Sequence, residues 1–349
     1  MKKKVVLAIF TLQGNGAERF ALTLAKGINN AGHEAHIVYF KNIIDLPIPD
    51  GVQTHFFDYQ KFRAIPKFMR AGIAAKAFDR FVRGKIGEPD LVLSNLFPVD
   101  FVLCKSTLPN VHLVIHNTTS LEYGERLFVM RERLAKVYLA KPCVAVSQGV
   151  RNDFIELFGS KGRITTIYNP IDIEQIVNTA NEYIPEPELN GGYIVHVGKF
   201  KHQKRHDILI KAYAKANITE KLVLVGTGEL FDGVKALVKS LGIENKVIFT
   251  GFKKNPYPYM KHAKFMVLSS DFEGLGLVIL ESLALGVPVI STDCLSGPSE
   301  ILPTQSLTPV GDVDALANKL QCFVELTNIT CNLDKKFTME TAVQSYLSL

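Results

Sequence analysis

Residues 267–301 read VLSSDFEGLGLVILESLALGVPVISTDCLSGPSEI, and this stretch decides the fold class. An apolar strand ends at Leu268, and a polar loop then leads through two glycines into an apolar helix that Gly286 ends. The β-branched segment 287–290 has the pattern of a second buried strand. A strand, a helix and another apolar strand in this order predict the β-α-β unit of a parallel α/β sheet.

The joint between the loop and the helix of this unit has the features of an anion site. Gly274 and Gly276 would let a ligand approach unpaired backbone N–H groups at the positive end of the helix. Glu273 and Glu281 flank that end, and carboxylates accept hydrogen bonds from hydroxyls. N–H groups for phosphate beside carboxylates for hydroxyls fit a sugar phosphate. The alternative is an ordinary loop-to-helix joint with two solvated glutamates.

Length and composition allow two domains and exclude several classes of protein. The chain has 349 residues, of which 47% are apolar and 21% charged, so it can bury large cores and is not disordered. Its five cysteines show no CxxC pair and no adjacent histidine cluster, which favours reduced thiols in the cytosol over a zinc or disulfide framework. No apolar run approaches the roughly 20 residues needed to cross a bilayer. We therefore expect a soluble or peripheral protein.

Strand and helix patterns alternate through two separate parts of the chain. The alternation runs through residues 1–180 and restarts at residue 193, after a segment rich in proline, glycine and glutamate at 181–192. We predict two Rossmann-like α/β domains, 1–180 and 193–334, joined by the linker 181–192, with a cleft between them. Residues 335–349 predict a final helix.

The first turn of the chain only partly matches a dinucleotide fingerprint. Gly14 and Gly16 follow the first strand, but the position of the third glycine is Arg19. No acidic residue stands convincingly at the end of the second strand, where an adenosine ribose is usually held. A nicotinamide-dependent oxidoreductase is therefore a weakly supported alternative.

Positive charge is concentrated in the first half of the chain. Residues 1–180 hold 23 Lys and Arg against 16 Asp and Glu, a balance of +7, whereas residues 181–349 hold 17 against 18. Segment 59–88 combines basic residues with a bulky apolar stripe, as helices on anionic membrane surfaces do. An ordinary packed helix with a basic outer face is the alternative, and no base-reading or stacking motif supports nucleic acid. The predicted membrane contacts are Lys61, Arg63, Lys67 and Arg70.

Several motifs in the same order resemble the retaining glycosyltransferases of family 4. EGLGLVILE at 273–281 resembles the Glu-x7-Glu signature of that family. The other matching segments are NGAERF (15–20), YNPID (168–172), HVGKFKHQKRHDILIKAY (196–213), VLVGTGEL (223–230) and FTGF (249–252). The resemblance covers nearly the whole chain. It implies the GT-B fold, in which two Rossmann-like domains face each other across a deep cleft and the final helix crosses back to the first domain.

The resemblance also implies an activity. It is the transfer of a sugar, with retention, from a nucleotide-diphosphate sugar such as a UDP-hexose or UDP-N-acetylhexosamine, with no metal or other cofactor. The acceptor would be a glycan or lipid-linked sugar of bacterial surface polysaccharide or lipopolysaccharide synthesis. The protein would work in the cytoplasm, with a peripheral position on the inner face of the cytoplasmic membrane as an option. A non-catalytic module that binds sugar nucleotides or glycans is the alternative.

Individual roles follow only from the resemblance. Glu273 would hold hydroxyls of the transferred sugar, Glu281 those of the ribose, and Lys199 and Lys204 would neutralise the diphosphate. His116 would lie near the sugar, so the implied catalytic residues are Glu273, Lys204 and His116. The remaining implied donor contacts are Gly16, Gly251, Phe252, Gly274, Leu275, Gly276, Leu277 and Val278.

The chain departs from the family pattern at one basic position, and its sequence offers no side chain for a covalent mechanism. Lys199 stands where the family often has arginine, and a lysine cannot bind phosphate in the bidentate manner of a guanidinium. No enzymic nucleophile is evident. The resemblance implies that the phosphate of the donor shields one face of the sugar and accepts the proton of the acceptor hydroxyl.

Overall fold

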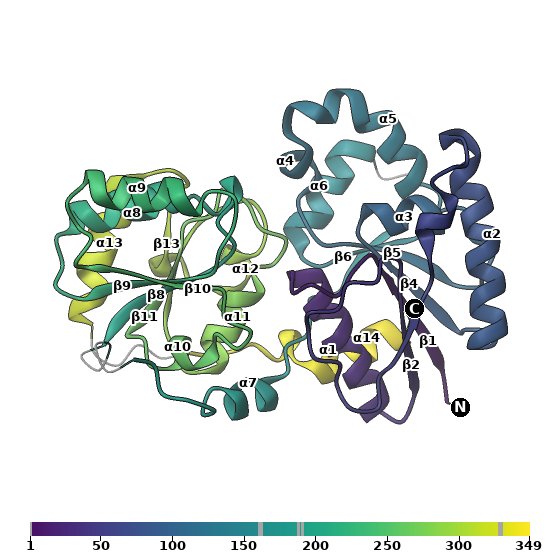
Figure 1. Ribbon diagram of the computed structural model, residues 1–349, viewed down its shortest axis with the longest axis horizontal. Coiled ribbons are helices and arrows are strands. Elements are labelled where there is room, and N and C mark those ends of the chain that lie inside the picture. The colour runs from purple at the N-terminus through teal and green to yellow at the C-terminus, as the bar shows by residue number, and fades with distance from the viewer. Residues whose placement is uncertain (1, 160–162, 187–188, 190–191, 327–330) are drawn as a thin grey trace. The chain divides into compact units, whose positions relative to one another are not determined.

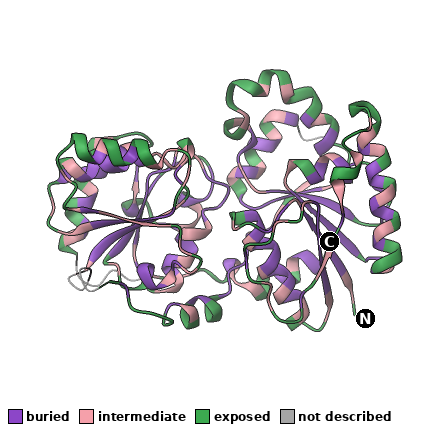
Figure 2. Cartoon of the chain, viewed as in Figure 1, coloured by how far each residue is buried: buried purple, intermediate pink, exposed green. Residues whose placement is uncertain are grey.

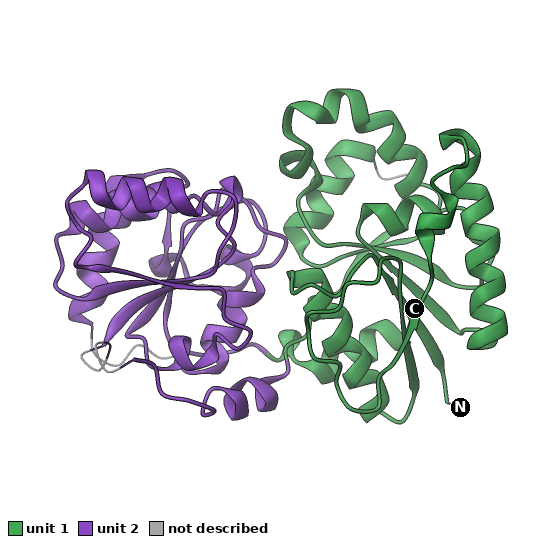
Figure 3. Cartoon of the chain, viewed as in Figure 1, with its two compact units in different colours: residues 1–171, 335–349 green, residues 172–334 purple. Residues whose placement is uncertain are grey.

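The computed structural model describes residues 2–159, 163–186, 189, 192–326 and 331–349. The chain divides into two compact units, and we call them unit 1 (residues 1–171 and 335–349) and unit 2 (residues 172–334) (Figure 3). Each unit contains one parallel sheet with helices packed on it (Figure 1). The prediction of two α/β units with parallel sheets is therefore confirmed.

Unit 1 is built on a seven-stranded sheet in the order β3-β2-β1-β4-β5-β6-β7. Its strands are β1 (Lys4–Ile9), β2 (Glu34–Tyr39), β3 (Gln53–Phe56), β4 (Leu91–Asn95), β5 (Val111–Ile115), β6 (Cys143–Ala145) and β7 (Ile164–Thr166). Its helices are α1 (Gly16–Asn30), α2 (Lys67–Lys85), α3 (Phe97–Leu103), α4 (Thr119–Tyr123), α5 (Leu127–Tyr138), α6 (Gln148–Phe158) and α14 (Met339–Leu347). The strand order reverses between β1 and β4, and α/β sheets bind ligands beside such a reversal.

Unit 2 repeats this topology with one strand fewer, in the order β10-β9-β8-β11-β12-β13. Its strands are β8 (Tyr193–Val197), β9 (Lys221–Val225), β10 (Val247–Gly251), β11 (Phe265–Leu268), β12 (Val289–Thr292) and β13 (Leu307–Thr308). Its helices are α7 (Ile173–Thr179), α8 (His206–Ala216), α9 (Phe231–Ser240), α10 (Tyr257–Lys261), α11 (Leu277–Ala284), α12 (Pro298–Ile301) and α13 (Val313–Glu325). Here the order reverses between β8 and β11.

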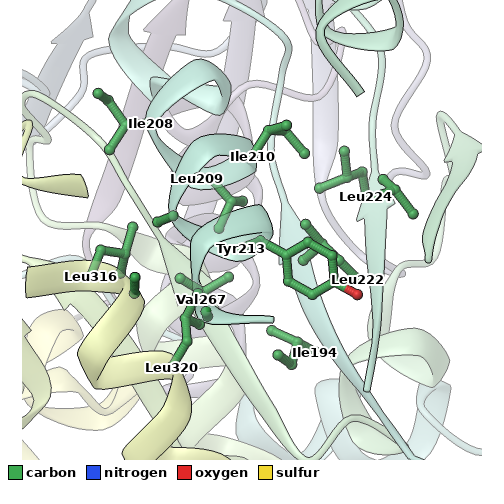
Figure 4. Close-up of a cluster of buried hydrophobic side chains, with 14 of the residues drawn as sticks. Ile194, Ile208, Leu209, Ile210, Tyr213, Leu222, Leu224, Val267, Leu316 and Leu320 are labelled. Carbon is green, nitrogen blue, oxygen red and sulfur yellow. The ribbon is translucent and has the colours of Figure 1, made fainter. Parts of the chain in front are cut away.

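Most strands of the sheet of unit 2 are buried, as Figure 2 shows, whereas the edge strand β10 is mostly half-buried. Successive side chains of β8 alternate between two apolar clusters, because neighbouring residues of a strand point to opposite faces. Ile194 belongs to the cluster that includes side chains of α8 and α13 (Figure 4), whereas Tyr193 and Val195 belong to the cluster on the other face. Both faces of the sheet are therefore covered, and polar ligands can reach only its edges.

The chain passes between the units at positions that differ from the predicted boundary. Helix α7, which the prediction placed in the first domain, packs against α10 and α11 of unit 2 and buries Ile176. The passages lie at Ile171 to Asp172 and at Asp334 to Lys335. Of the predicted linker 181–192, residues 187–188 and 190–191 lie outside the described residues.

The final helix belongs to unit 1. Helix α14 packs on α1, where the rings of Phe20 and Tyr346 have centroids 5.8 Å apart. Just before α14, Ile171 and Thr338 form a short parallel bridge. None of the helices in the described part of the chain combines the length and the apolar character needed to cross a bilayer.

Candidate active site

The site begins where the sheet of unit 2 reverses its order, between β8 and β11. Strands β8 and β11 are parallel neighbours, so the loops that follow them leave the same edge of the sheet. The loop after β8 carries Lys199 and Lys204, and the loop after β11 carries Glu273. The crevice beside such a reversal is where α/β sheets bind their ligands.

Lys204 and Glu273 form a largely buried ion pair at this edge. Lys204 Nζ lies 2.6 Å from Glu273 Oε1, and the two side chains are 13% and 9% exposed. Ser270 Oγ donates to the same carboxylate oxygen at 2.6 Å, and the carbonyl of Ser270 accepts from Thr292 Oγ1 at 2.6 Å. The carboxylate and the ammonium are thus held in place where little water screens their charges.

The two loops are also joined directly along their backbones. The N–H of Asp271 donates to the carbonyl of Gln203 at 2.9 Å, and Gln203 Nε2 donates to the carbonyl of Phe272 at 2.6 Å. Ser269 Oγ donates to the carbonyl of Lys204 at 2.8 Å. These bonds position Lys204 and Glu273 through their neighbours, not only through each other.

Arg205 joins the same two loops through an ion pair. Its backbone is left-handed (φ 47°, ψ 48°), which costs a residue with a Cβ about 1–2 kcal/mol. Its guanidinium pairs with Asp207 at 2.9 Å and with Asp271 at 3.0 Å. The ion pair to Asp271 ties the turn after Lys204 to the loop that carries Glu273.

The segment from Glu273 into α11 needs its glycines. Gly276 precedes the helix with φ +83°, a conformation that favours glycine. Gly297 has φ +89°, and a Cβ on it would lie 2.3 Å from the carbonyl oxygen of Leu275, so the loop after β12 packs directly on this segment. The side chain of Leu275 is buried, whereas Leu277 and Val278 are half-buried. Leu275 can therefore serve a ligand only through its backbone, as predicted for the run from Gly274 to Val278.

Other predicted donor residues lie on α11, on the loop after β8 and at the end of β10. Glu281 is half-buried on α11 and accepts a hydrogen bond from Tyr257 Oη at 3.1 Å. Lys199 is exposed, and its ammonium pairs with no carboxylate of the described residues. Gly251 ends β10 and accepts from the N–H of Gly226 at 2.9 Å, and Phe252 after it is 55% exposed. In the part of the chain that the structure describes, no hydrogen bond or ion pair joins these residues to the Lys204–Glu273 pair.

Two buried histidines that were not predicted as site residues lie beside Lys204. His196 Nδ1 lies 2.9 Å from the carbonyl oxygen of Val267, and burial lowers the pKa of His196 to about 4. The ring of His206 stacks on Phe200 with centroids 4.0 Å apart, and burial lowers the pKa of His206 to about 2. Neither ring nitrogen of His206 has a hydrogen-bond partner among the described residues. Both imidazoles are neutral at neutral pH, so the positive charge next to these two rings is that of Lys204.

Unit 1 places His116 at the carboxyl end of β5. His116 Nε2 lies 2.8 Å from Asn95 Oδ1, and Asn95 Nδ2 donates to the carbonyls of Ala8 and Leu93, which orients the amide. Nε2 therefore carries the proton and donates to Asn95, and Nδ1 carries a lone pair. Burial lowers the pKa of His116 to about 3, so the ring is a neutral hydrogen-bond acceptor.

Gly16 is the first residue of α1, and a buried carboxylate holds the turn before it. Glu18 is 0% exposed and accepts from the N–H groups of Gly14 and Asn15, both at 2.7 Å. Its other carboxylate oxygen accepts from Thr11 Oγ1. Glu18 was not predicted as a site residue, although it stands directly before Arg19, the position of the missing third glycine. The signal was present, because Asn15 and Glu18 have the spacing of a capping box.

The basic segment of unit 1 is only partly available to a partner. Lys61, Arg63 and Lys67 are exposed, whereas the guanidinium of Arg70 donates to the carbonyls of Arg63 and Ile65 at 2.7 and 2.9 Å. Toward the end of α2 the apolar side chains of this stripe are buried in the core of unit 1. The apolar side chains exposed at the start of α2 are Phe68 (86%) and Met69 (47%). Most of α2 is thus an ordinary packed helix, as the alternative interpretation expected. Its first turn remains a candidate surface for membrane contact.

The ion pair predicts a specific pattern of stabilities. Lys204→Met or Glu273→Leu alone leaves one buried charge without its partner and should lower the free energy of unfolding by about 3–5 kcal/mol. The double variant leaves no unpaired charge and should lose less than either single variant. Urea unfolding followed by circular dichroism suits this chain, which has no tryptophan. Additive losses would show that the two groups do not interact.

The buried histidines predict how stability depends on pH. A histidine in the unfolded chain takes up a proton below its usual pKa of about 6.5, whereas folded His206 does not until the pH is far lower. Stability should therefore fall as the pH decreases from about 6.5. His206→Phe should reduce the loss between pH 7 and pH 5 by roughly 2 kcal/mol. The same loss in the variant and the parent would contradict the neutral state of His206.

No group of three or more His, Cys, Asp or Glu side chains in the described residues is arranged to hold a metal ion.

Two family patterns match the chain in sequence. Residues 14–175 match the family described as Glycosyltransferase Family 4, and residues 181–338 match Glycosyl transferases group 1. Each pattern covers most of one unit.

Individual relatives extend over most of the chain. It is 31% identical over 321 residues to the Campylobacter jejuni N-acetylgalactosamine-N,N'-diacetylbacillosaminyl-diphospho-undecaprenol 4-alpha-N-acetylgalactosaminyltransferase, covering 89% of this chain and 87% of that protein. It is 31% identical to the lipopolysaccharide 1,6-galactosyltransferase of Salmonella typhimurium over 46% of this chain and 45% of that one.

Solved structures show the same fold at lower identity. Anabaena HepE in complex with UDP-glucose has a TM-score of 0.81 at 19% identity, covering 99% of this chain and 98% of that one. The lipopolysaccharide outer core galactosyltransferase WaaB has a TM-score of 0.72 at 20% identity, with the same coverage of both chains. The predicted GT-B fold is confirmed, and the chain belongs to the glycosyltransferases that share it.

Proposed function

We propose that this protein is a retaining, metal-independent glycosyltransferase of the family 4 type. It moves a hexose or N-acetylhexosamine from its UDP derivative to a glycan or lipid-linked acceptor of bacterial surface polysaccharide or lipopolysaccharide synthesis. The observation that carries the proposal is the Lys204–Glu273 pair at the strand-order reversal of unit 2, directly before the N-terminus of α11. The names of the relatives add support, since the Campylobacter protein is named for a diphospho-undecaprenol acceptor and HepE was solved with UDP-glucose.

Unit 2 supplies the groups that hold a donor. Glu273 takes hydroxyls of the transferred sugar, and Glu281 takes those of the ribose. Lys204, together with the backbone N–H groups from Gly274 to Val278, neutralises the diphosphate, and exposed Lys199 adds a second cation. Gly251 and Phe252 contact the base, for which the exposed ring of Phe252 offers a flat apolar face.

The positions of these groups suit the departure of a diphosphate. As the bond between the anomeric carbon and the phosphate oxygen breaks, the bond electrons go to the leaving diphosphate. Lys204 is already held by Glu273 and by the joined loops, so it stabilises the growing charge without having to reorganise. The acceptor hydroxyl attacks the same face of the sugar, and its proton passes to a phosphate oxygen of the leaving group. The products are the glycosylated acceptor and UDP.

From unit 1 we propose Gly16 and His116 as further donor contacts. His116 is neutral and keeps a lone pair at Nδ1, so it accepts a hydrogen bond from a sugar hydroxyl. A neutral ring also adds no positive charge beside the anomeric carbon, which becomes positive in the transition state. The Glu18 carboxylate holds the turn that presents Gly16.

The activity is tested with purified protein, a panel of UDP-sugars and a lipid-linked acceptor. Glu281→Ala should weaken UDP binding about 10- to 100-fold, because hydrogen bonds to a charged group are lost. Lys204→Ala should lower kcat by at least about 100-fold, as the loss of one oxyanion donor does. Glu244→Ala and Lys239→Ala change exposed residues and serve as matched controls.

Three outcomes would contradict this assignment. Binding of UDP-sugars without transfer or hydrolysis would favour the non-catalytic module. Binding of NADH but not of UDP-sugars, measured by titration, would favour the oxidoreductase. Unchanged rates in both the Glu281 and the Lys204 variants would show that the reaction takes place elsewhere.

We further propose that the protein works in the cytoplasm and that the start of α2, with the turn before it, contacts the anionic inner face of the membrane. Lys61, Arg63 and Lys67 are exposed beside Phe68 and Met69, which gives this surface both charge and apolar side chains. Each basic residue near such a surface contributes about 1 kcal/mol. Arg70 is not part of this surface, because its guanidinium is bonded to the preceding turn.

Vesicle sedimentation tests the membrane contact. Binding should require anionic lipid and should decrease with salt. Arg63→Glu with Lys67→Glu should weaken it at least about tenfold, because two attractive charges become repulsive. Lys211→Glu with Lys239→Glu in unit 2 changes the net charge equally and should bind as the parent does. Equal binding by both double variants would reject the role of α2.

A further inference from the structure

The predicted ribose carboxylate has a protein partner that the sequence analysis did not assign. Tyr257, the first residue of α10, donates its phenol proton to Glu281 Oε1 at 3.1 Å. Both residues are half-buried. Among the described residues, the side chain of Glu281 has no other hydrogen bond or ion pair. A carboxylate has about four acceptor sites, so one phenol leaves most of them for a ligand.

Tyr257 is itself held in place by the loop before α10. Its N–H donates to Asn255 Oδ1 at 3.1 Å, and Asn255 Nδ2 donates to the carbonyl of Thr179 and to Glu182 Oε2, both at 2.8 Å. Tyr183 Oη donates to the carbonyl of Asn255 at 2.6 Å. These bonds within unit 2 hold the backbone at the start of α10, and the bond to Glu281 holds the phenol.

We propose that Tyr257 is a positioning residue that makes the site selective for ribonucleotides over deoxyribonucleotides. The phenol holds the carboxylate of Glu281 in one orientation, with its remaining lone pairs directed to the hydroxyls of a ribonucleoside diphosphate. A group fixed in advance does not lose conformational freedom when the ligand binds, so its hydrogen bonds contribute more to affinity. This inference rests on the proposed function, in which Glu281 holds the ribose.

The role of the phenol can be separated from packing of the ring. The Tyr257 ring packs against the apolar cluster that contains Tyr259 and Met260. Tyr257→Phe keeps this packing and removes only the hydroxyl. Tyr259→Phe is a matched control on the same helix, because Tyr259 Oη donates to a different carboxylate, Glu186, at 2.7 Å.

Calorimetric titration with UDP, 2′-deoxy-UDP and 3′-deoxy-UDP tests the inference. The parent should bind UDP at least about tenfold more tightly than either deoxy analogue, since a hydrogen bond to a charged group is lost. Tyr257→Phe should bind UDP about five- to tenfold more weakly, while its affinity for the deoxy analogues changes much less, so that the preference for ribose falls. In the transfer assay the KM for the donor should rise with little change in kcat. Tyr259→Phe should keep the parental preference.

The possible failures are distinguishable. Equal loss of affinity for UDP and both deoxy analogues in Tyr257→Phe, or an unchanged preference for ribose, would overturn the role of Tyr257 while leaving the glycosyltransferase assignment intact. A parent protein that binds UDP but does not distinguish it from the deoxy analogues would likewise overturn only this inference. A parent that binds no UDP would overturn both.

Discussion

The hydrogen-bonded contact between residues 203–205 and residues 269–273 is the feature on which the candidate site depends. It exists because β8 and β11 are neighbours at the point where the strand order of unit 2 reverses. The loops that follow them are joined through backbone, amide and carboxylate groups. Burying the Lys204–Glu273 pair costs desolvation energy, and such a pair is retained only where further hydrogen bonds satisfy its members. Ser270 and the joined backbones meet this condition here.

The electrostatic character of the site follows from which groups keep their charge. In unit 2, His196 and His206 beside Lys204 are neutral because burial lowers their pKa values well below neutrality, and in unit 1 burial does the same for His116. Positive charge at this edge of unit 2 therefore comes from lysines and from the N-terminus of α11. This arrangement matches a leaving group that gains negative charge. It also leaves His116 as an uncharged acceptor, suited to a sugar hydroxyl.

Much of this architecture could be predicted from the sequence, because it depends on local patterns. The alternation of strands and helices identified two α/β units, and the glycines around Glu273 located the start of α11. The pairing of Lys204 with Glu273 could not be predicted, since it joins residues 69 positions apart and depends on which strands are neighbours. The same reason applies to Tyr257 with Glu281 and to Asn95 with His116. Helix α7 was misplaced because a composition shift marked a linker, whereas packing on α10 and α11 decides the unit to which it belongs.

The central claim is that the loops at the reversal of unit 2 form a preorganised donor site. Hydrogen–deuterium exchange of the full chain with and without UDP tests it most directly. Protection should appear in residues 198–205, 249–252 and 273–281, and it should be absent from α2, which lies outside the proposed donor site. Full occupancy by UDP without protection of residues 273–281 would contradict the claim.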